Sequence, residues 1–151
     1  MKKILLGLCL LLTALPGFAF QPLPVDEAFA LSAQTNKKSV VLHWKLASGY
    51  YLYRDRISLK PTQNINLTMG IAKEDDILGK YQVYEDKLIL TVPAATKLVV
   101  NYQGCAASGF CYPPVSKLVS INGNVVNITN AEDATTSSIA IADVETAQDK
   151  A

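Results

Sequence analysis

The sequence predicts a single all-β domain, a sandwich or a barrel built from short strands. From residue 39 onward, short runs rich in Val, Ile, Leu and Tyr recur with turn residues between them. The clearest run, residues 39–46, alternates apolar and polar side chains with the period of two that a half-buried strand requires. No run shows helical periodicity of comparable strength, and a length of 151 residues fits one domain.

The first 19 residues have the composition of a secretory signal peptide. Lys2 and Lys3 precede an apolar run over residues 4–15, and small residues follow it. This run is shorter than the roughly 20 residues that a membrane-spanning helix needs, so we expect export and cleavage after Ala19. Cys9 would leave with the signal peptide, and the exported chain would keep two cysteines.

The folded body is expected to span residues 20–128. A short helical turn or an edge segment is expected within residues 21–31, which contain two prolines. The spacing of the later runs is typical of a sandwich or a barrel. The predicted strands cover residues 39–46, 50–59, 65–69, 87–92, 97–103 and 115–121.

Residues 129–151 differ in composition from the folded body. They are rich in Ala, Thr, Ser and Asp and contain no aromatic residue, which is typical of a flexible linker or tail. Removing Lys2 and Lys3 from the 14 basic residues leaves 12 against 13 acidic ones, a net charge of −1. This balance argues against nucleic acid as a partner, because such binding depends on many phosphate contacts.

The two cysteines of the expected exported chain, Cys105 and Cys111, lie in the segment NYQGCAASGFCYPPV. Their loop can close as a disulfide, since the compartment beyond the membrane is oxidising. Spacing alone leaves two interpretations open, an inert staple or a redox-active pair. His43 is the single histidine, so we expect neither a metal site, which needs four ligands, nor a cysteine–histidine nucleophile.

The stretch YQGCAASGFCYPP resembles the active-site hairpin of a known family, the N-terminal periplasmic domains of the DsbD thiol:disulfide interchange proteins of Gram-negative bacteria. GYYLYRDRI, at residues 49–57, is similar to the family's tyrosine-rich strand. EDDILGKYQVYEDKLIL, at residues 74–90, resembles its cap region and the strand that follows. The resemblance covers about residues 20–125 and implies an immunoglobulin-like β-sandwich with the cysteine pair on a hairpin at one end.

The resemblance also implies a function, that of a periplasmic protein-disulfide reductase domain. A thioredoxin-like domain would donate electrons, and periplasmic disulfide isomerases and cytochrome c maturation thioredoxins would accept them. Cys111 would form the mixed disulfides and Cys105 would resolve them, with no cofactor besides this redox-active disulfide. The alternative is a non-catalytic exported β-sandwich binding module whose disulfide is purely structural.

One departure from the family concerns the length of the chain. The sequence ends at Ala151 without the family's transmembrane and thioredoxin-like domains. We therefore expect either a fragment cut within a linker or a stand-alone domain, and contact with the membrane only through a missing or separate transmembrane partner.

Residues on both sides of the cysteine pair are expected to shape the site. Tyr51 and Tyr53 share one face of their strand, so at least one of them should reach the cysteines. Phe110 and Tyr112 flank Cys111 and would give a thioredoxin-like partner an apolar docking surface.

The resemblance places a cap loop over both cysteines, around residues 75–79. Asp75 and Asp76 would raise a thiol pKa by their negative charge and so limit stray reactivity. Either Ile77 or Leu78 should turn inward, while the carboxylates stay in water. The family typically places an aromatic residue here, so this cap is a second departure from its pattern.

Overall fold

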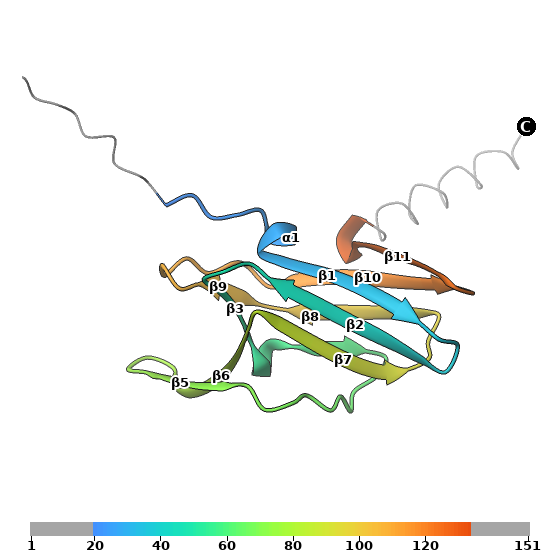
Figure 1. The fold of residues 1–151 in the computed structure, drawn as a ribbon, viewed down its shortest axis with the longest axis horizontal. Coiled ribbons are helices and arrows are strands. Elements are labelled where there is room, and N and C mark those ends of the chain that lie inside the picture. Colours follow the sequence, from blue (N-terminus) through green and yellow to red (C-terminus); the bar gives the residue numbers. More distant parts are fainter. Residues whose placement is uncertain (1–19, 134–151) are drawn as a thin grey trace, which may run out of the picture.

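The structure, a computed structural model, describes residues 20–133; the predicted signal peptide and most of the predicted tail lie outside them. The described residues fold into antiparallel sheets, with short helical segments that include α1 (Val25–Ala28) and η1 (Arg54–Arg56) (Figure 1). The first sheet contains, in order, β1 (Phe29–Thr35), β2 (Ser39–Leu46) and β7 (Lys87–Pro93). The second contains β11 (Val125–Asn130), β10 (Val115–Asn122), β8 (Lys97–Tyr102) and β4 (Ser58–Lys60). The third contains β5 (Ile71–Asp75), β6 (Gly79–Glu85), β3 (Tyr50–Tyr53) and β9 (Gly104–Ala106).

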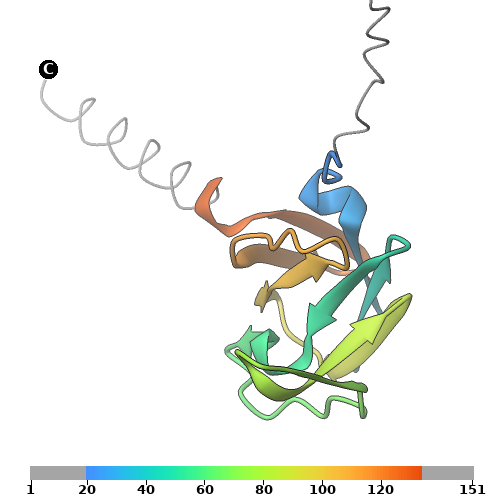
Figure 2. The same ribbon diagram turned by 90° about the vertical axis from the view of Figure 1, so that its left-hand side faces the viewer.

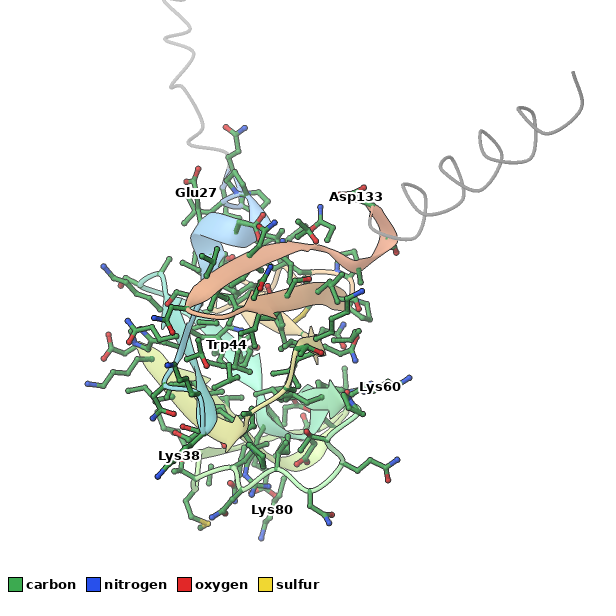
Figure 3. The ribbon with its side chains drawn as sticks, turned by 90° about the vertical axis from the view of Figure 1, so that its right-hand side faces the viewer. Glu27, Lys38, Trp44, Lys60, Lys80 and Asp133 are labelled. Carbon is green, nitrogen blue, oxygen red and sulfur yellow. A yellow bond between two sulfur atoms is a disulfide. The ribbon has the colours of Figure 1, made fainter. Side chains whose placement is uncertain are left out.

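The core lies between the first two sheets, and the alternation of β2 builds one side of it. Val40, Leu42, Trp44 and Leu46 are all buried, as their period of two predicts. The Trp44 ring meets Tyr102 of β8 edge to face at 5.9 Å, and it lies in the interior of the molecule (Figure 3). The prediction of an all-β sandwich is confirmed, and the fold is immunoglobulin-like.

Two of the predicted strands differ from the structure. The run 50–59 is divided by η1, so that β3 and β4 belong to different sheets. The predicted strand at 65–69 is wrong, because this segment is an irregular connection. The Arg54 guanidinium donates to the carbonyls of Leu67 and Thr68 at 3.2 Å each, and Tyr84 Oη donates to Thr68 at 2.6 Å. Side chains thus satisfy backbone groups that a strand would have used for pairing.

Several elements add to the predicted set. The predicted runs 87–92, 97–103 and 115–121 are confirmed as β7, β8 and β10, and the helical turn expected within 21–31 is α1. Strands β5, β6, β9 and β11 were not predicted as strands, and β11 runs to Asn130, past the expected end of the body at residue 128.

The third sheet lies at one end of the sandwich and positions the cysteines (Figures 1 and 2). Its central strand β3 pairs with β6 on one side and with β9 on the other. In this register Tyr51 lies opposite Cys105 on β9, and Tyr53 lies opposite Val83 on β6. The tyrosine strand and the cysteine strand are therefore direct neighbours.

A buried lysine on β10 contacts both α1, near the start of the described residues, and β11, near their end. Lys117 of β10 is 6% exposed, and its Nζ lies 2.6 Å from an Asp26 carboxylate oxygen of α1. The same Nζ donates to Asn130 Oδ1 of β11 at 2.8 Å. Because a buried ammonium needs such partners, this contact fixes α1 on the sandwich.

Candidate active site

The site is a disulfide with one buried and one exposed cysteine. Cys105 and Cys111 are bonded, with an S–S distance of 2.10 Å. Cys105 is held within β9 and is 0% exposed, whereas Cys111 lies just beyond the loop and is exposed. A thiolate approaching from solvent can therefore reach the sulfur of Cys111 and not that of Cys105.

Backbone hydrogen bonds hold the loop between the two cysteines. Ala106 N–H donates to Phe110 at 2.7 Å, and Tyr112 N–H donates to the Gly104 carbonyl at 3.0 Å. The loop turns back at Gly109, whose φ of +101° is a conformation that favours glycine. These bonds join the two limbs of the loop independently of the sulfur–sulfur bond.

A cluster of tyrosines lies against the buried sulfur. The Tyr53 hydroxyl is 3.5 Å from Cys105 Sγ, and it must be the donor because a disulfide sulfur carries no proton. The Tyr53 ring packs 5.5 Å from Tyr51 and 5.6 Å from Tyr81. Burial, together with the neighbouring Tyr51, raises the pKa of Tyr53 to about 12, so its hydroxyl remains a proton donor at neutral pH.

This arrangement settles the expected placement of the tyrosines. The rings of Tyr51 and Tyr53 pack together; Tyr51 lies opposite Cys105 in the register, and Tyr53 places its hydroxyl on the Cys105 sulfur. Tyr81 was not predicted as a site residue. Its alternation with Val83 could have placed the two on one face of β6, but the pairing of β6 with β3 could not be read from the sequence.

A groove of about 370 Å³ runs beside the disulfide and includes both cysteines in its lining. Tyr53 and Gln103 line it, as do Leu78 and Tyr81 from the β5–β6 hairpin. Gln103, also unpredicted, donates from Nε2 to the Tyr112 carbonyl at 3.1 Å. The groove gives an incoming protein segment a path to the exposed sulfur.

The cap segment is the turn of the β5–β6 hairpin. Asp75 accepts the backbone N–H groups of Ile77 and Leu78, at 2.9 and 2.5 Å, and Gly79 closes the turn with a φ of +69°. The Leu78 hydrogen bond holds the pKa of Asp75 below its usual value. Asp76 is exposed at the tip of the turn.

The two apolar cap residues have different surroundings. Leu78 is 52% exposed and lines the groove with the cysteines, whereas Ile77 is 93% exposed and is not part of the groove lining. The cap therefore forms one wall of the groove and leaves Cys111 exposed, where a cover over both cysteines was expected. Aromatic residues do line the groove, but they are Tyr53 on β3 and Tyr81 on β6, outside the cap turn.

This difference predicts unequal shielding of the reduced thiol. Leu78→Ala should increase the alkylation rate of Cys111 by iodoacetamide severalfold, because it removes the apolar side chain beside the sulfur. Ile77→Ala is the matched control and should leave the rate unchanged. Equal rates in both variants would contradict a shielding role for this wall. The reaction of the reduced protein is stopped at successive times, and mass spectrometry measures the fraction of Cys111 that is alkylated.

The two residues that flank Cys111 differ in their exposure. Phe110 is 40% exposed and extends the apolar surface beside the sulfur. Tyr112, expected on the docking surface, is 7% exposed and points inward, packing 4.9 Å from Phe110 and 5.2 Å from Phe29. Its hydroxyl donates to the Leu23 carbonyl, which no local sequence pattern could have indicated.

Residues 20–133 contain neither a cluster of metal-ligating side chains nor an apolar helix of membrane-spanning length. No group of three or more His, Cys, Asp and Glu side chains lies close enough to hold a metal ion in this part of the chain. Within the same residues, no helix has the length and apolar character needed to cross a bilayer.

Comparison with known proteins adds sequence relatives. Residues 19–123 match the family model described as thiol:disulfide interchange protein DsbD, N-terminal. Proteins named thiol:disulfide interchange protein DsbD are 41% identical in Escherichia coli O157:H7 and 40% in strain K12, each over 116 residues and 71% of this chain. The chain spans only 20% of the length of these curated relatives.

Solved structures agree with the sequence comparison. The reduced DsbD N-terminal domain of Neisseria meningitidis is 30% identical, with a TM-score of 0.60 over 72% of this chain and 95% of the other. A complex between the DsbD and PilB N-terminal domains of the same organism contains a chain that is 31% identical, with a TM-score of 0.62 over 75% and 96% of the two chains.

Proposed function

Because the chain belongs to the family of DsbD N-terminal domains, we propose that it is a periplasmic thiol–disulfide exchange domain that passes electrons through Cys105 and Cys111. Its electrons come from a thioredoxin-like donor domain. They go to disulfides of periplasmic proteins, namely disulfide isomerases and the thioredoxins of cytochrome c maturation. The domain is one component of a protein-disulfide reductase system, and transfer across the membrane belongs to other components.

The observation that carries this proposal is the unequal exposure of the two cysteines. A thiolate of the donor attacks exposed Cys111 Sγ and expels Cys105 as a thiolate. The Tyr53 hydroxyl, 3.5 Å from Cys105 Sγ, stabilises the charge that develops there. The second thiol of the donor then attacks the mixed disulfide, leaving this domain reduced and the donor oxidised by two electrons.

Reduction of an acceptor follows the same path in reverse. The Cys111 thiolate attacks the acceptor disulfide and forms a mixed disulfide, releasing the acceptor's other sulfur as a thiolate. Cys105 then loses its proton and attacks Cys111 Sγ, which regenerates the intramolecular disulfide and frees the reduced acceptor. Protons and two electrons are balanced without any cofactor.

The surface around Cys111 suits a protein partner. Phe110 and Leu78 are exposed apolar side chains next to the disulfide, and the groove lies open beside them. The complex of the Neisseria domain with the PilB N-terminal domain supports a protein partner for this chain as well.

The redox equilibrium separates this proposal from a purely structural disulfide. Titrating the domain with glutathione buffers should give a reduction potential above about −300 mV, within the range of its exchange partners. A potential well below that value would instead support the non-catalytic binding module. The fraction of oxidised protein is measured by alkylation and mass spectrometry, and a variant lacking both thiols (C105A/C111A) sets the background.

A further inference from the structure

The residues before α1 form hydrogen bonds, through the backbone of Leu23, to two tyrosines near the cysteine pair. Residues 20–24, here called the N-terminal strap, belong to no helix or strand. Leu23 N–H donates to the Tyr50 hydroxyl at 3.0 Å, and its carbonyl accepts from the Tyr112 hydroxyl. Both polar backbone groups of Leu23 are thus satisfied by tyrosine side chains that are far away in the sequence.

One of these tyrosines follows the cysteine loop, and the other lies on the strand that pairs with β9. Tyr50 lies on β3 opposite Ala106, the residue that follows Cys105. Tyr112 directly follows Cys111, and its ring lies 6.2 Å from that of Tyr50. Tyr50 and Tyr112 are 6% and 7% exposed, so these hydrogen bonds form largely away from water. The strap therefore joins β3, the strand that pairs with the Cys105 strand, to the limb that carries Cys111.

The strap is itself fixed to the sandwich. Leu23 and Val25 pack against the hydrophobic core, and the Pro24 carbonyl accepts the N–H groups of Glu27 and Ala28 at 2.9 Å. Lys117 fixes α1 through Asp26. A strap anchored in this way can restrain the loop.

We propose that the N-terminal strap is coupled to the redox state of the cysteine pair and favours the disulfide over the two thiols. In the oxidised state the sulfur–sulfur bond and the backbone hydrogen bonds of the loop hold the limbs together. In the reduced state the sulfur–sulfur bond is absent, and the strap adds its restraint to the backbone hydrogen bonds, so that the thiols stay close enough to re-form the disulfide. Closer thiols raise their effective concentration, which favours ring closure.

The coupling is reciprocal. If the strap favours the disulfide by a given factor, the disulfide must favour the closed strap by the same factor, since the two equilibria form one thermodynamic cycle. Reduction should therefore loosen the strap. This inference rests on the proposed function, because only a pair that alternates between two redox states makes use of the coupling.

The test compares tyrosine-to-phenylalanine variants, which keep the rings and remove only the hydroxyls. The reaction followed is protein disulfide plus two glutathione thiols, giving protein dithiol plus oxidised glutathione. Y50F/Y112F should shift its equilibrium constant toward the dithiol about threefold to tenfold. Tyr84→Phe is the matched control, because Tyr84 is 6% exposed and its hydroxyl also donates to a backbone carbonyl, that of Thr68. This control should leave the equilibrium unchanged.

An unchanged equilibrium in a folded Y50F/Y112F variant would overturn the inference, as would an equal shift in the control. Folding is checked by circular dichroism and melting temperature, which a purely structural role would lower without moving the redox equilibrium. Glutathione is the only exchange partner, so the result does not depend on recognition of a thioredoxin-like protein. Failure of the proposed function would appear separately, as a potential well below about −300 mV in the wild-type protein.

Amide hydrogen exchange in the wild-type protein provides a second measurement that needs no variant. The Leu23 N–H should exchange severalfold faster after the cysteines are reduced, while the Leu42 N–H in the centre of β2 should keep its rate. Equal exchange of Leu23 in the two redox states would show that the strap does not sense the disulfide.

Discussion

Cys105→Ala is expected to accumulate a mixed disulfide between Cys111 and a thioredoxin-like protein, while Cys111→Ala accumulates almost none. Cys111 is the exposed sulfur, and without Cys105 no neighbouring thiol can release the bound partner. The partner is a thioredoxin-like protein that lacks its own resolving cysteine and carries an activated disulfide on its remaining cysteine. After mixing, the adduct should be the dominant species. Non-reducing electrophoresis and mass spectrometry measure it.

The two single variants serve as controls for each other, since each keeps one thiol in the same loop. Dithiothreitol should release the partner from the Cys105→Ala adduct and restore both proteins. If Cys111→Ala accumulated the adduct instead, or if neither variant did, the assigned roles of the two sulfurs would be wrong.

Gly104→Ala is expected to cost about 3 kcal/mol of folding free energy and to displace Cys105. A Cβ at this position would overlap the Tyr51 carbonyl oxygen and would lie 2.5 Å from the Phe29 ring, which is 0% exposed. Neither the strand backbone nor a fully buried ring can move away easily. Chemical denaturation measures the loss in stability, and the rate of reduction by dithiothreitol reports the displaced sulfur.

Gly49→Ala is the matched control for this variant. An added Cβ there meets no atom within 4 Å, so its cost comes only from the φ of +81°, roughly 1–2 kcal/mol. A Gly104→Ala variant as stable as Gly49→Ala would show that the Phe29 and Tyr51 contacts are looser than the structure indicates.

The parts of the fold that could be predicted are those with a local signal. The alternation in residues 39–46 is visible in the sequence itself, and it appears as β2 with the expected buried face. Strand β9 has only three residues, Gly104–Ala106, all buried, so it offers neither length nor alternation. At residues 65–69 the apolar content suggested a strand, but hydrogen bonds from Arg54 and Tyr84 hold the segment in another conformation.

The same distinction applies to the site. The cysteine motif and the shared face of Tyr51 and Tyr53 are local features, so the sequence was enough to indicate them. The inward orientation of Tyr112 depends on Leu23, which is 89 positions away, and the place of Tyr81 depends on the pairing of β6 with β3. Such contacts are decided by packing between distant segments, which no short pattern encodes.

The unequal exposure of the two cysteines has a kinetic consequence for a relay. Cys105 is enclosed in β9, so under the proposed function donor and acceptor would both react at the accessible Cys111. Two proteins cannot occupy that atom together, so no ternary complex can form on the route between them. Turnover must then be ping-pong, with an excess of either partner acting as a competitive inhibitor of the other.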